Sequence, residues 1–203
     1  MILYFHDLLY PRKACAAAAY LEAPVTLEWV DVGHDRHKSP EFLALNPNGL
    51  LPVLVDGEHV IWESNAILCY LAGRTRPDFW PTDSRHVELI RWLSWDAAAF
   101  SNYAGALYFE LYVRRRFDLG LPDEGAVAEA RQRFDGCAAV LDAHLSGRDW
   151  VVGEAPTAAD FALGASLPYA EAIGLPIADH AEIGKWYERL SGLRGWRDPF
   201  AVP

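Results

Sequence analysis

The chain has 203 residues, of which 52% are hydrophobic and 23% are charged, as in a globular protein with a sizeable buried core. Its formal net charge of −10 disfavours nucleic acid and anionic membranes as partners. An anionic ligand would therefore need a local set of hydrogen-bond donors. No apolar run is long enough to span a bilayer, and residues 1–4 lack the basic region of a signal peptide.

The chain contains three cysteines, Cys15, Cys69 and Cys137, which lie far apart in the sequence. They form no C-x-x-C pair, and no His/Cys cluster has the spacing of a zinc site. We therefore expect no metal, and reduced thiols in a cytoplasmic protein.

The first part of the chain alternates between strand and helix patterns. Ile2–Phe5 is a short apolar strand, and Pro11 can occupy the first turn of a helix that continues through the small apolar residues to Leu21. Thr26–Val32 predicts a second strand. Ser39, Pro40 and Glu41 then have the order of a helix cap, a first-turn proline and an acid, so a short helix is expected up to Leu45.

Residues 46–71, NPNGLLPVLVDGEHVIWESNAILCYL, combine a turn, a hairpin and a helix start. Asp56-Gly57 is a strong hairpin signal between the strands 53–55 and 59–62. Glu63-Ser64 then opens a helix, whose first amide groups are left without partners inside the helix. The pattern fits two alternatives: a simple helix cap, in which Ser64 satisfies these amides, or a site for an anionic group at this helix start.

Residues 75–83 contain two prolines and no periodicity, and they predict a linker between domains 1–74 and 84–203. The second domain has helical patterns at 84–117, 124–145 and 183–190, and a capping box at Thr157 and Asp160.

Several of these motifs, in this order, resemble the cytosolic glutathione transferase family, with theta-like and beta-like members as the nearest pattern. The residues that carry the resemblance are Asn46-Pro47, Gly49, Leu51-Pro52, Leu54, Glu63-Ser64, Ala66-Ile67 and Tyr70-Leu71. The resemblance implies an α/β thioredoxin-like N-terminal domain followed by an all-α helical C-terminal domain. It also implies a detoxification enzyme that joins the thiolate of glutathione to a small electrophile.

The resemblance implies a glutathione site in the first domain. Glu63 and Ser64 are expected to bind the γ-glutamyl end. Leu51, which precedes a cis Pro52, is expected to bind the backbone of the cysteinyl residue. The family often has a Lys or Gln at the position of Leu50, which would contact the glycyl carboxylate. Because this contact is missing here, His37 and Lys38 are its candidate replacements.

A free thiol is mostly protonated at neutral pH, so catalysis needs a group that stabilises the thiolate. Tyr10 falls where theta-like and beta-like members carry a Ser or Cys, and it directly precedes Pro11. Tyr4 is the rival, because alpha-, mu- and pi-like members use a tyrosine at the end of the first strand. A third possibility is that neither tyrosine has this role. Cys15 is expected in the core.

The second substrate is expected between the domains, with wall residues from the long helix: Trp95, Tyr103, Leu107 and Tyr108. The resemblance also implies a homodimer. Two other functions stay open at this point: a non-catalytic glutathione-binding or protein-interaction module on the same fold, and a thiol-disulfide reductase or peroxidase. The reductase would need a cysteine where this chain has Tyr10.

Overall fold

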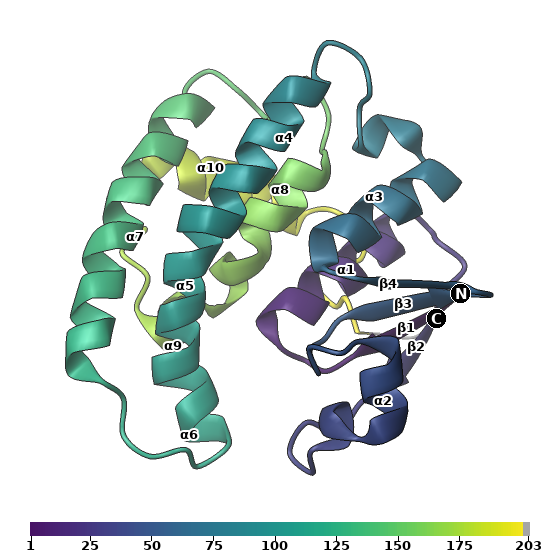
Figure 1. Ribbon diagram of the computed structural model, residues 1–203. Coiled ribbons are helices and arrows are strands. Elements are labelled where there is room, and N and C mark those ends of the chain that lie inside the picture. Colours follow the sequence, from purple (N-terminus) through teal and green to yellow (C-terminus); the bar gives the residue numbers. More distant parts are fainter. Residues whose placement is uncertain (201–203) are drawn as a thin grey trace. The chain divides into compact units, whose positions relative to one another are not determined.

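The structure, a computed structural model, describes residues 1–200 and divides into two compact units. The first unit contains Met1–Trp80 together with a segment that begins at Leu193, and the second contains Pro81–Gly192. Figure 1 labels the elements of both units along the chain.

The first unit is built on a four-stranded mixed sheet with the order β2–β1–β3–β4. Its strands are β1 (Ile2–Phe5), β2 (Thr26–Trp29), β3 (Val53–Asp56) and β4 (His59–Trp62). β1 is parallel to β2 and antiparallel to β3, which is in turn antiparallel to β4. All four strands were predicted from the sequence. β2 ends before the expected Val32 because its pairing partner, β1, ends at Phe5 opposite Trp29.

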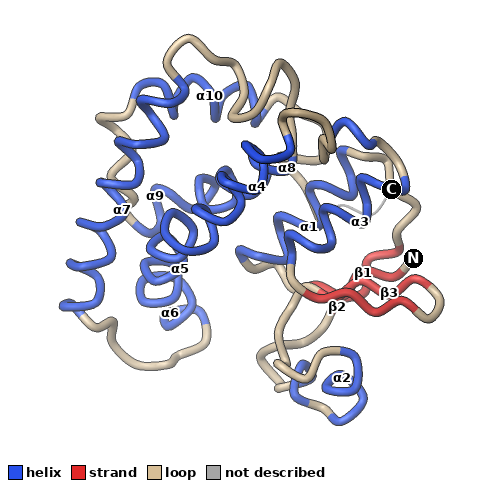
Figure 2. The backbone as a smooth tube through the Cα atoms, turned by 45° about the horizontal axis from the view of Figure 1, so that its top comes forward, coloured by secondary structure: helices blue, strands red, loops and turns tan. Residues whose placement is uncertain are grey.

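Helices cover both faces of this sheet. α1 (Leu9–Tyr20) and α3 (Ser64–Arg74) lie on one face, and α2 (Pro40–Leu45) lies on the other (Figure 2). The alanines and Cys15 in residues 14–18 of α1 are at most 2% exposed, so small side chains let this helix approach its neighbours closely. Two short 3₁₀ helices, Arg36–Lys38 and Pro77–Phe79, lie in the connections.

α1 begins two residues earlier than the sequence pattern suggested. Pro11 is its third residue, and the first helical bond runs from the Arg12 N–H to the Leu8 carbonyl at 3.0 Å. A proline is compatible with this position because the first four N–H groups of a helix have no helical acceptor. Tyr10 therefore lies inside the first turn of α1.

The last described segment of the chain packs onto α1. The Arg12 guanidinium donates to the Trp196 carbonyl oxygen and lies 4.9 Å from the centroid of the Trp196 ring. Gly195 has a φ of +78° and approaches Ala19 so closely that a β-carbon at this position would collide with it. Phe200 stacks on Phe5 at 5.4 Å. The segment thus belongs to the first unit, whereas the sequence suggested a helical domain over residues 84–203.

The second unit is helical, as predicted. The expected helix over 84–117 is a nearly continuous helical path with two π-helical segments. Its parts are α4 (His86–Trp95), the π segment Asp96–Phe100, α5 (Ser101–Tyr108), the π segment Phe109–Val113 and α6 (Arg114–Arg116). The remaining elements are α7 (Glu124–Leu145), α8 (Ala158–Leu163), the 3₁₀ helix Gly164–Tyr169, α9 (Ala170–Ile173) and α10 (Ala181–Ser191). Within residues 1–200, no helix has the length and apolar character needed to cross a membrane.

A buried aspartate links the start of α8 to two other parts of the second unit. Asp160 is 0% exposed, and its carboxylate accepts the Thr157 N–H at 2.8 Å, which forms the predicted capping box. The same group accepts the Val151 N–H at 2.9 Å and the Trp186 indole N–H at 2.9 Å. Burial raises the pKa of Asp160, and these donated hydrogen bonds oppose that rise.

We expect the Asp160→Ala variant to lose more stability than the Thr157→Ala variant. Removing the Thr157 cap should cost about 1 kcal/mol. Removing Asp160 leaves three buried N–H donors and the Thr157 hydroxyl without this acceptor, at about 1–3 kcal/mol for each unpaired donor, so a loss of roughly 3 kcal/mol or more is expected. Urea denaturation measures both free energies of unfolding. Asp149→Ala is the control, because its side chain is 75% exposed in a surface ion pair with Arg189. An Asp160→Ala midpoint equal to that of Asp149→Ala would contradict the assignment.

Candidate functional site

Four chain segments meet at one end of the sheet in the first unit. The register pairs Tyr4 with Val53 and Val53 with Trp62. β1, β2 and β4 therefore all end where β3 begins, and we call this place the carboxyl end of the sheet. The segments that follow β1, β2 and β4 lie here, as does the segment that precedes β3. The order of the strands thus brings together residues that are far apart in the sequence.

The start of α3 provides amide donors at this end. The first helical bond of α3 runs from the Ile67 N–H to the Glu63 carbonyl at 3.1 Å, so the N–H groups of Ser64, Asn65 and Ala66 have no acceptor within the helix. Ser64 is only 7% exposed, and Glu63 has a φ of +71° with an exposed side chain. A hydroxyl and a helix N-terminus can hold a carboxylate, and the adjacent Glu63 carboxylate can pair with an ammonium group.

The turn before β3 is fixed by a buried asparagine. Asn46 is 2% exposed, and its side-chain amide donates to the Leu50 carbonyl at 2.8 Å while its oxygen accepts the Asn48 N–H at 3.1 Å. Gly49 has a φ of +61°, which favours glycine. The turn leads into the Leu51–Pro52 peptide bond, which is cis. Leu51 is half-buried and immediately precedes the cis bond at the carboxyl end of the sheet.

The segment after β2 lies against the same turn. A β-carbon on Gly49 would be 3.2 Å from the His37 carbonyl oxygen. His37 is half-buried, and burial lowers its pKa, with the positive charge of Lys38 as a smaller contribution in the same direction. The Lys38 ammonium is exposed and pairs with Asp35 at 2.8 Å. Leu50 is 62% exposed.

The two candidate tyrosines lie in different surroundings. Tyr10 is the second residue of α1 and is 43% exposed. Tyr4 is half-buried in β1, where its ring contacts Phe42 of α2 edge-on at 6.1 Å. The Tyr4 side chain thus lies on the face of the sheet that α2 covers. The helices α1 and α3 cover the opposite face (Figure 2).

A contact that the sequence analysis missed joins α1 to α3. The Lys13 ammonium donates to the Asn65 side-chain oxygen at 2.7 Å, and Lys13 is 3% exposed. The signal in the sequence was a lysine directly before the run of small apolar residues in the expected helix. Asn65 directly follows Ser64, so this bond connects the starts of the two helices at the carboxyl end.

The four residues suggested for the second substrate have different neighbours within the helical unit. Leu107 is fully buried, and Tyr108 is 4% exposed in a cluster with the rings of Tyr112 and Tyr169 at 4.9 and 4.8 Å. Burial raises the pKa of Tyr108. Trp95 packs on Trp92 and Phe100, at 5.3 and 5.8 Å. The fourth residue, Tyr103, lines a groove beside α7. Leu107 and Tyr108 thus lie in the interior of the helical unit, whereas Tyr103 lines a groove.

The cysteine thiols are poor nucleophiles in this structure. Cys15 is 1% exposed, and burial raises the pKa of its thiol to about 12. Burial also raises the pKa of Cys69 and of Cys137. Within the described residues, no group of three or more His, Cys, Asp or Glu side chains could hold a metal ion.

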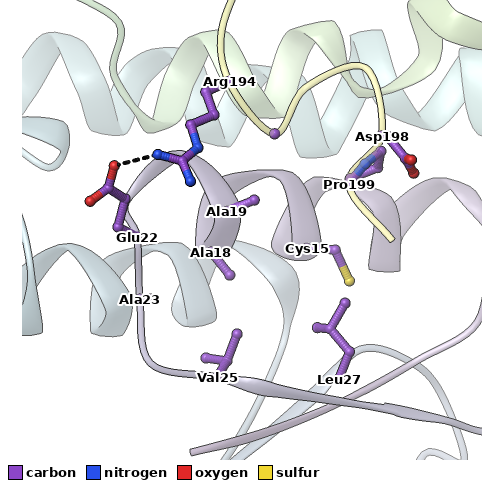
Figure 3. Close-up of a pocket in the computed structure, with 11 residues that line it drawn as sticks. Cys15, Ala18, Ala19, Glu22, Ala23, Val25, Leu27, Arg194, Asp198 and Pro199 are labelled. Atoms are coloured by element: carbon purple, nitrogen blue, oxygen red, sulfur yellow. Dashed lines mark hydrogen bonds and ion pairs between the residues drawn. The ribbon is translucent and has the colours of Figure 1, made fainter. Parts of the chain in front are cut away.

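Cys15 lines a cavity of about 420 Å³ between α1, β2 and the C-terminal segment, shown in Figure 3. An ion pair between Glu22 and Arg194, at 3.0 Å, lies at its margin. Val25 and Leu27, at the start of β2, also line it, so the cavity lies toward the end of the sheet opposite the carboxyl end. It is separate from the candidate site.

The chain is similar to known proteins over most of its length. Residues 3–73 match the model of the glutathione S-transferase N-terminal domain, and residues 124–198 match that of the glutathione S-transferase C-terminal domain. Glutathione S-transferase 3 of Zea mays is 33% identical over 85% of this chain and 80% of its own length. Glutathione S-transferase F10 of Arabidopsis thaliana is 29% identical over 98% of this chain and 96% of its own length.

A solved structure shares the fold across both units. The crystal structure of a possible glutathione S-transferase from Rhodopseudomonas palustris superposes with a TM-score of 0.88 and 27% identity, covering 100% of this chain and 90% of that one. Both domain models and the relatives that span most of the chain therefore agree, and the protein belongs to the glutathione S-transferase family.

Proposed function

We propose that this enzyme joins the thiolate of glutathione to a small apolar electrophile at the carboxyl end of the sheet. The observation that carries the proposal is the start of α3, where the buried Ser64 and three amide N–H groups without helical acceptors lie beside the segment with the cis Leu51–Pro52 bond. This set of donors suits an anionic ligand in a chain of net charge −10.

Each part of glutathione has a complementary group in this proposal. The γ-glutamyl carboxylate accepts from Ser64 and the α3 amides, and the γ-glutamyl ammonium pairs with Glu63. The cysteinyl backbone bonds to the N–H and C=O of Leu51. The glycyl carboxylate lies near His37 and Lys38, which replace the contact that the apolar side chain of Leu50 does not make.

Tyr10 is the proposed donor to the sulfur. Its position in the first turn of α1, next to the bridge between α1 and α3, supports it over Tyr4, which packs on the opposite face of the sheet. A hydroxyl that donates to the thiolate lowers the pKa of the glutathione thiol and increases the reactive fraction. The sulfur then attacks the electrophilic carbon, a carbon–sulfur bond forms, and the electron pair departs with the leaving group or moves into the electrophile.

The thiols of the protein argue against the reductase alternative. A reductase needs a cysteine of low pKa at the site, whereas Tyr10 stands there and burial raises the pKa of all three cysteines. The sulfur nucleophile therefore comes from glutathione.

The proposal also includes the finer points of the resemblance: a cytoplasmic homodimer that detoxifies apolar compounds. Exposed apolar residues on α4, Val87 at 77% and Ile90 at 40% exposure, support a protein contact there. Trp95, Tyr103, Leu107 and Tyr108 remain the proposed second-substrate residues.

We expect the Ser64→Ala variant to bind reduced glutathione at least about tenfold more weakly, because a hydrogen bond to a carboxylate is lost. Isothermal titration calorimetry measures the dissociation constant. A Glu63→Gln variant is titrated in parallel. Its matched control is Glu58→Gln, because Glu58 is exposed in the hairpin turn. Equal affinity of Ser64→Ala and the unchanged protein would refute the placement of the γ-glutamyl group.

We expect Tyr10→Phe to lower kcat by roughly tenfold to a hundredfold, while Tyr4→Phe leaves it nearly unchanged. The acidic limb of the pH–rate profile should also move to higher pH in Tyr10→Phe, because the bound thiol loses the donor that lowers its pKa. Steady-state assays with 1-chloro-2,4-dinitrobenzene measure both effects. The opposite ranking of the two variants would assign the role to Tyr4. If neither substitution changed kcat, both tyrosines would be excluded as donors to the thiolate.

We expect the affinity for S-methylglutathione, which has no thiol to titrate, to increase as the pH falls from about 8 to about 6. In the free protein the pKa of His37 is lowered, so its imidazole is neutral near pH 7. A bound glycyl carboxylate favours the charged imidazole and raises that pKa, so binding takes up a proton. Calorimetry at several pH values should show a flatter dependence for His37→Gln. An unchanged slope in that variant would remove His37 from the site.

A further inference from the structure

Lys13 is a buried cation on a helix that otherwise packs through small apolar residues. It is 3% exposed, and its ammonium donates to the Asn65 side-chain oxygen at 2.7 Å. Burying an ammonium group is costly unless its hydrogen bonds are replaced, so a lysine at this position needs a reason beyond packing.

The position of this bond suggests that reason. Lys13 lies three residues after Tyr10 and therefore on the same side of α1, one turn further along. Asn65 directly follows Ser64 in the first turn of α3. The bond thus joins the helix that carries the proposed thiolate donor to the helix that carries the proposed carboxylate site.

Two other cations of the first unit have partners away from the start of α3. Arg12, also buried, donates to the Trp196 carbonyl and stacks on the Trp196 ring, so it holds the C-terminal segment. Lys38 is exposed and pairs with Asp35. Lys13 is therefore the buried cation whose observed bond leads to the first turn of α3.

The start of α3 also lacks an ordinary helix cap. Its N-cap residue, Glu63, makes no side-chain capping bond. The orientation of this first turn consequently depends on contacts from outside the helix, and the Lys13–Asn65 bond is such a contact.

We propose that Lys13 is a positioning residue for the glutathione site: through Asn65 it holds the first turn of α3, with its free amides and Ser64, in the orientation that receives the γ-glutamyl carboxylate. The inference rests on the proposed function and adds to it a residue that does not touch the ligand.

A double-mutant cycle tests this inference in the full-length protein. The variants are Lys13→Met, Asn65→Ala and the combination of both, assayed for glutathione with 1-chloro-2,4-dinitrobenzene as the electrophile. We expect each single variant to raise the KM for glutathione about tenfold, since a charge-assisted hydrogen bond is lost, with little change in kcat. The combined variant should be no worse than either single variant, because both remove the same bond.

Two controls keep the test independent of folding. Lys13→Arg retains the charge and the donor and should restore most of the affinity, while Lys185→Met removes an exposed lysine of α10 and should change nothing. A Lys13→Met variant with a lower melting temperature and an unchanged KM would reduce Lys13 to a structural residue and overturn the inference. If Lys13→Met does not fold, the KM of Asn65→Ala for glutathione decides instead. An unchanged KM in that variant would also overturn the inference.

The outcomes also separate this inference from the proposed function. If the protein without substitutions binds no glutathione, the proposed function and the inference are both contradicted. The second case is a protein that binds glutathione but whose combined variant raises the KM by the product of the two single effects. This result contradicts the inference alone.

Discussion

The register of three neighbouring strands is the constraint on which the candidate site depends. Because Tyr4, Val53 and Trp62 are aligned across β1, β3 and β4, the chain must leave β1 and β4, and enter β3, at the same end of the sheet. A shift of one residue in this register would turn every side chain of a strand to the opposite face. In β1, Leu3 and Phe5 are buried on one face while Ile2 is exposed, so such a shift would expose core side chains, and the hydrophobic core therefore fixes the register.

The second feature is the set of hydrogen-bond donors that a protein of net charge −10 collects at the start of α3. The amides at the start of α3 carry the positive end of the helix dipole, and they need no charged side chain in contact with the ligand. The buried Lys13 adds a positive charge behind that helix start, and its bond to Asn65 holds α1 and α3 together. Amide donors and one buried positive charge thus lie near the start of α3 in a chain of net charge −10.

Much of this arrangement could be predicted from local patterns. The four strands, the cap at Ser39 and the capping box at Asp160 follow from short-range rules, and the structure confirms them. The Lys13–Asn65 bond, by contrast, joins residues 52 positions apart, and neither residue has a local signal for the other. The C-terminal segment likewise packs against Arg12 and Ala19, and the pattern of hydrophobic residues in the sequence does not predict these contacts. The sequence left open whether Tyr10, Tyr4 or neither donates to the thiolate, and only the structure shows that Tyr4 packs against α2 while Tyr10 lies in the first turn of α1.

The central claim is that glutathione binds at the carboxyl end of the sheet. The most direct measurement is an NMR titration of ¹⁵N-labelled protein with reduced glutathione, which follows each backbone amide separately. The account predicts that the largest shifts occur at Leu51, Ser64 and Asn65, while Val25 and Leu27, at the opposite end of the sheet, stay unchanged. Shifts centred on Val25, Leu27 and Gly195 would place the ligand in the cavity beneath the C-terminal segment and contradict the account.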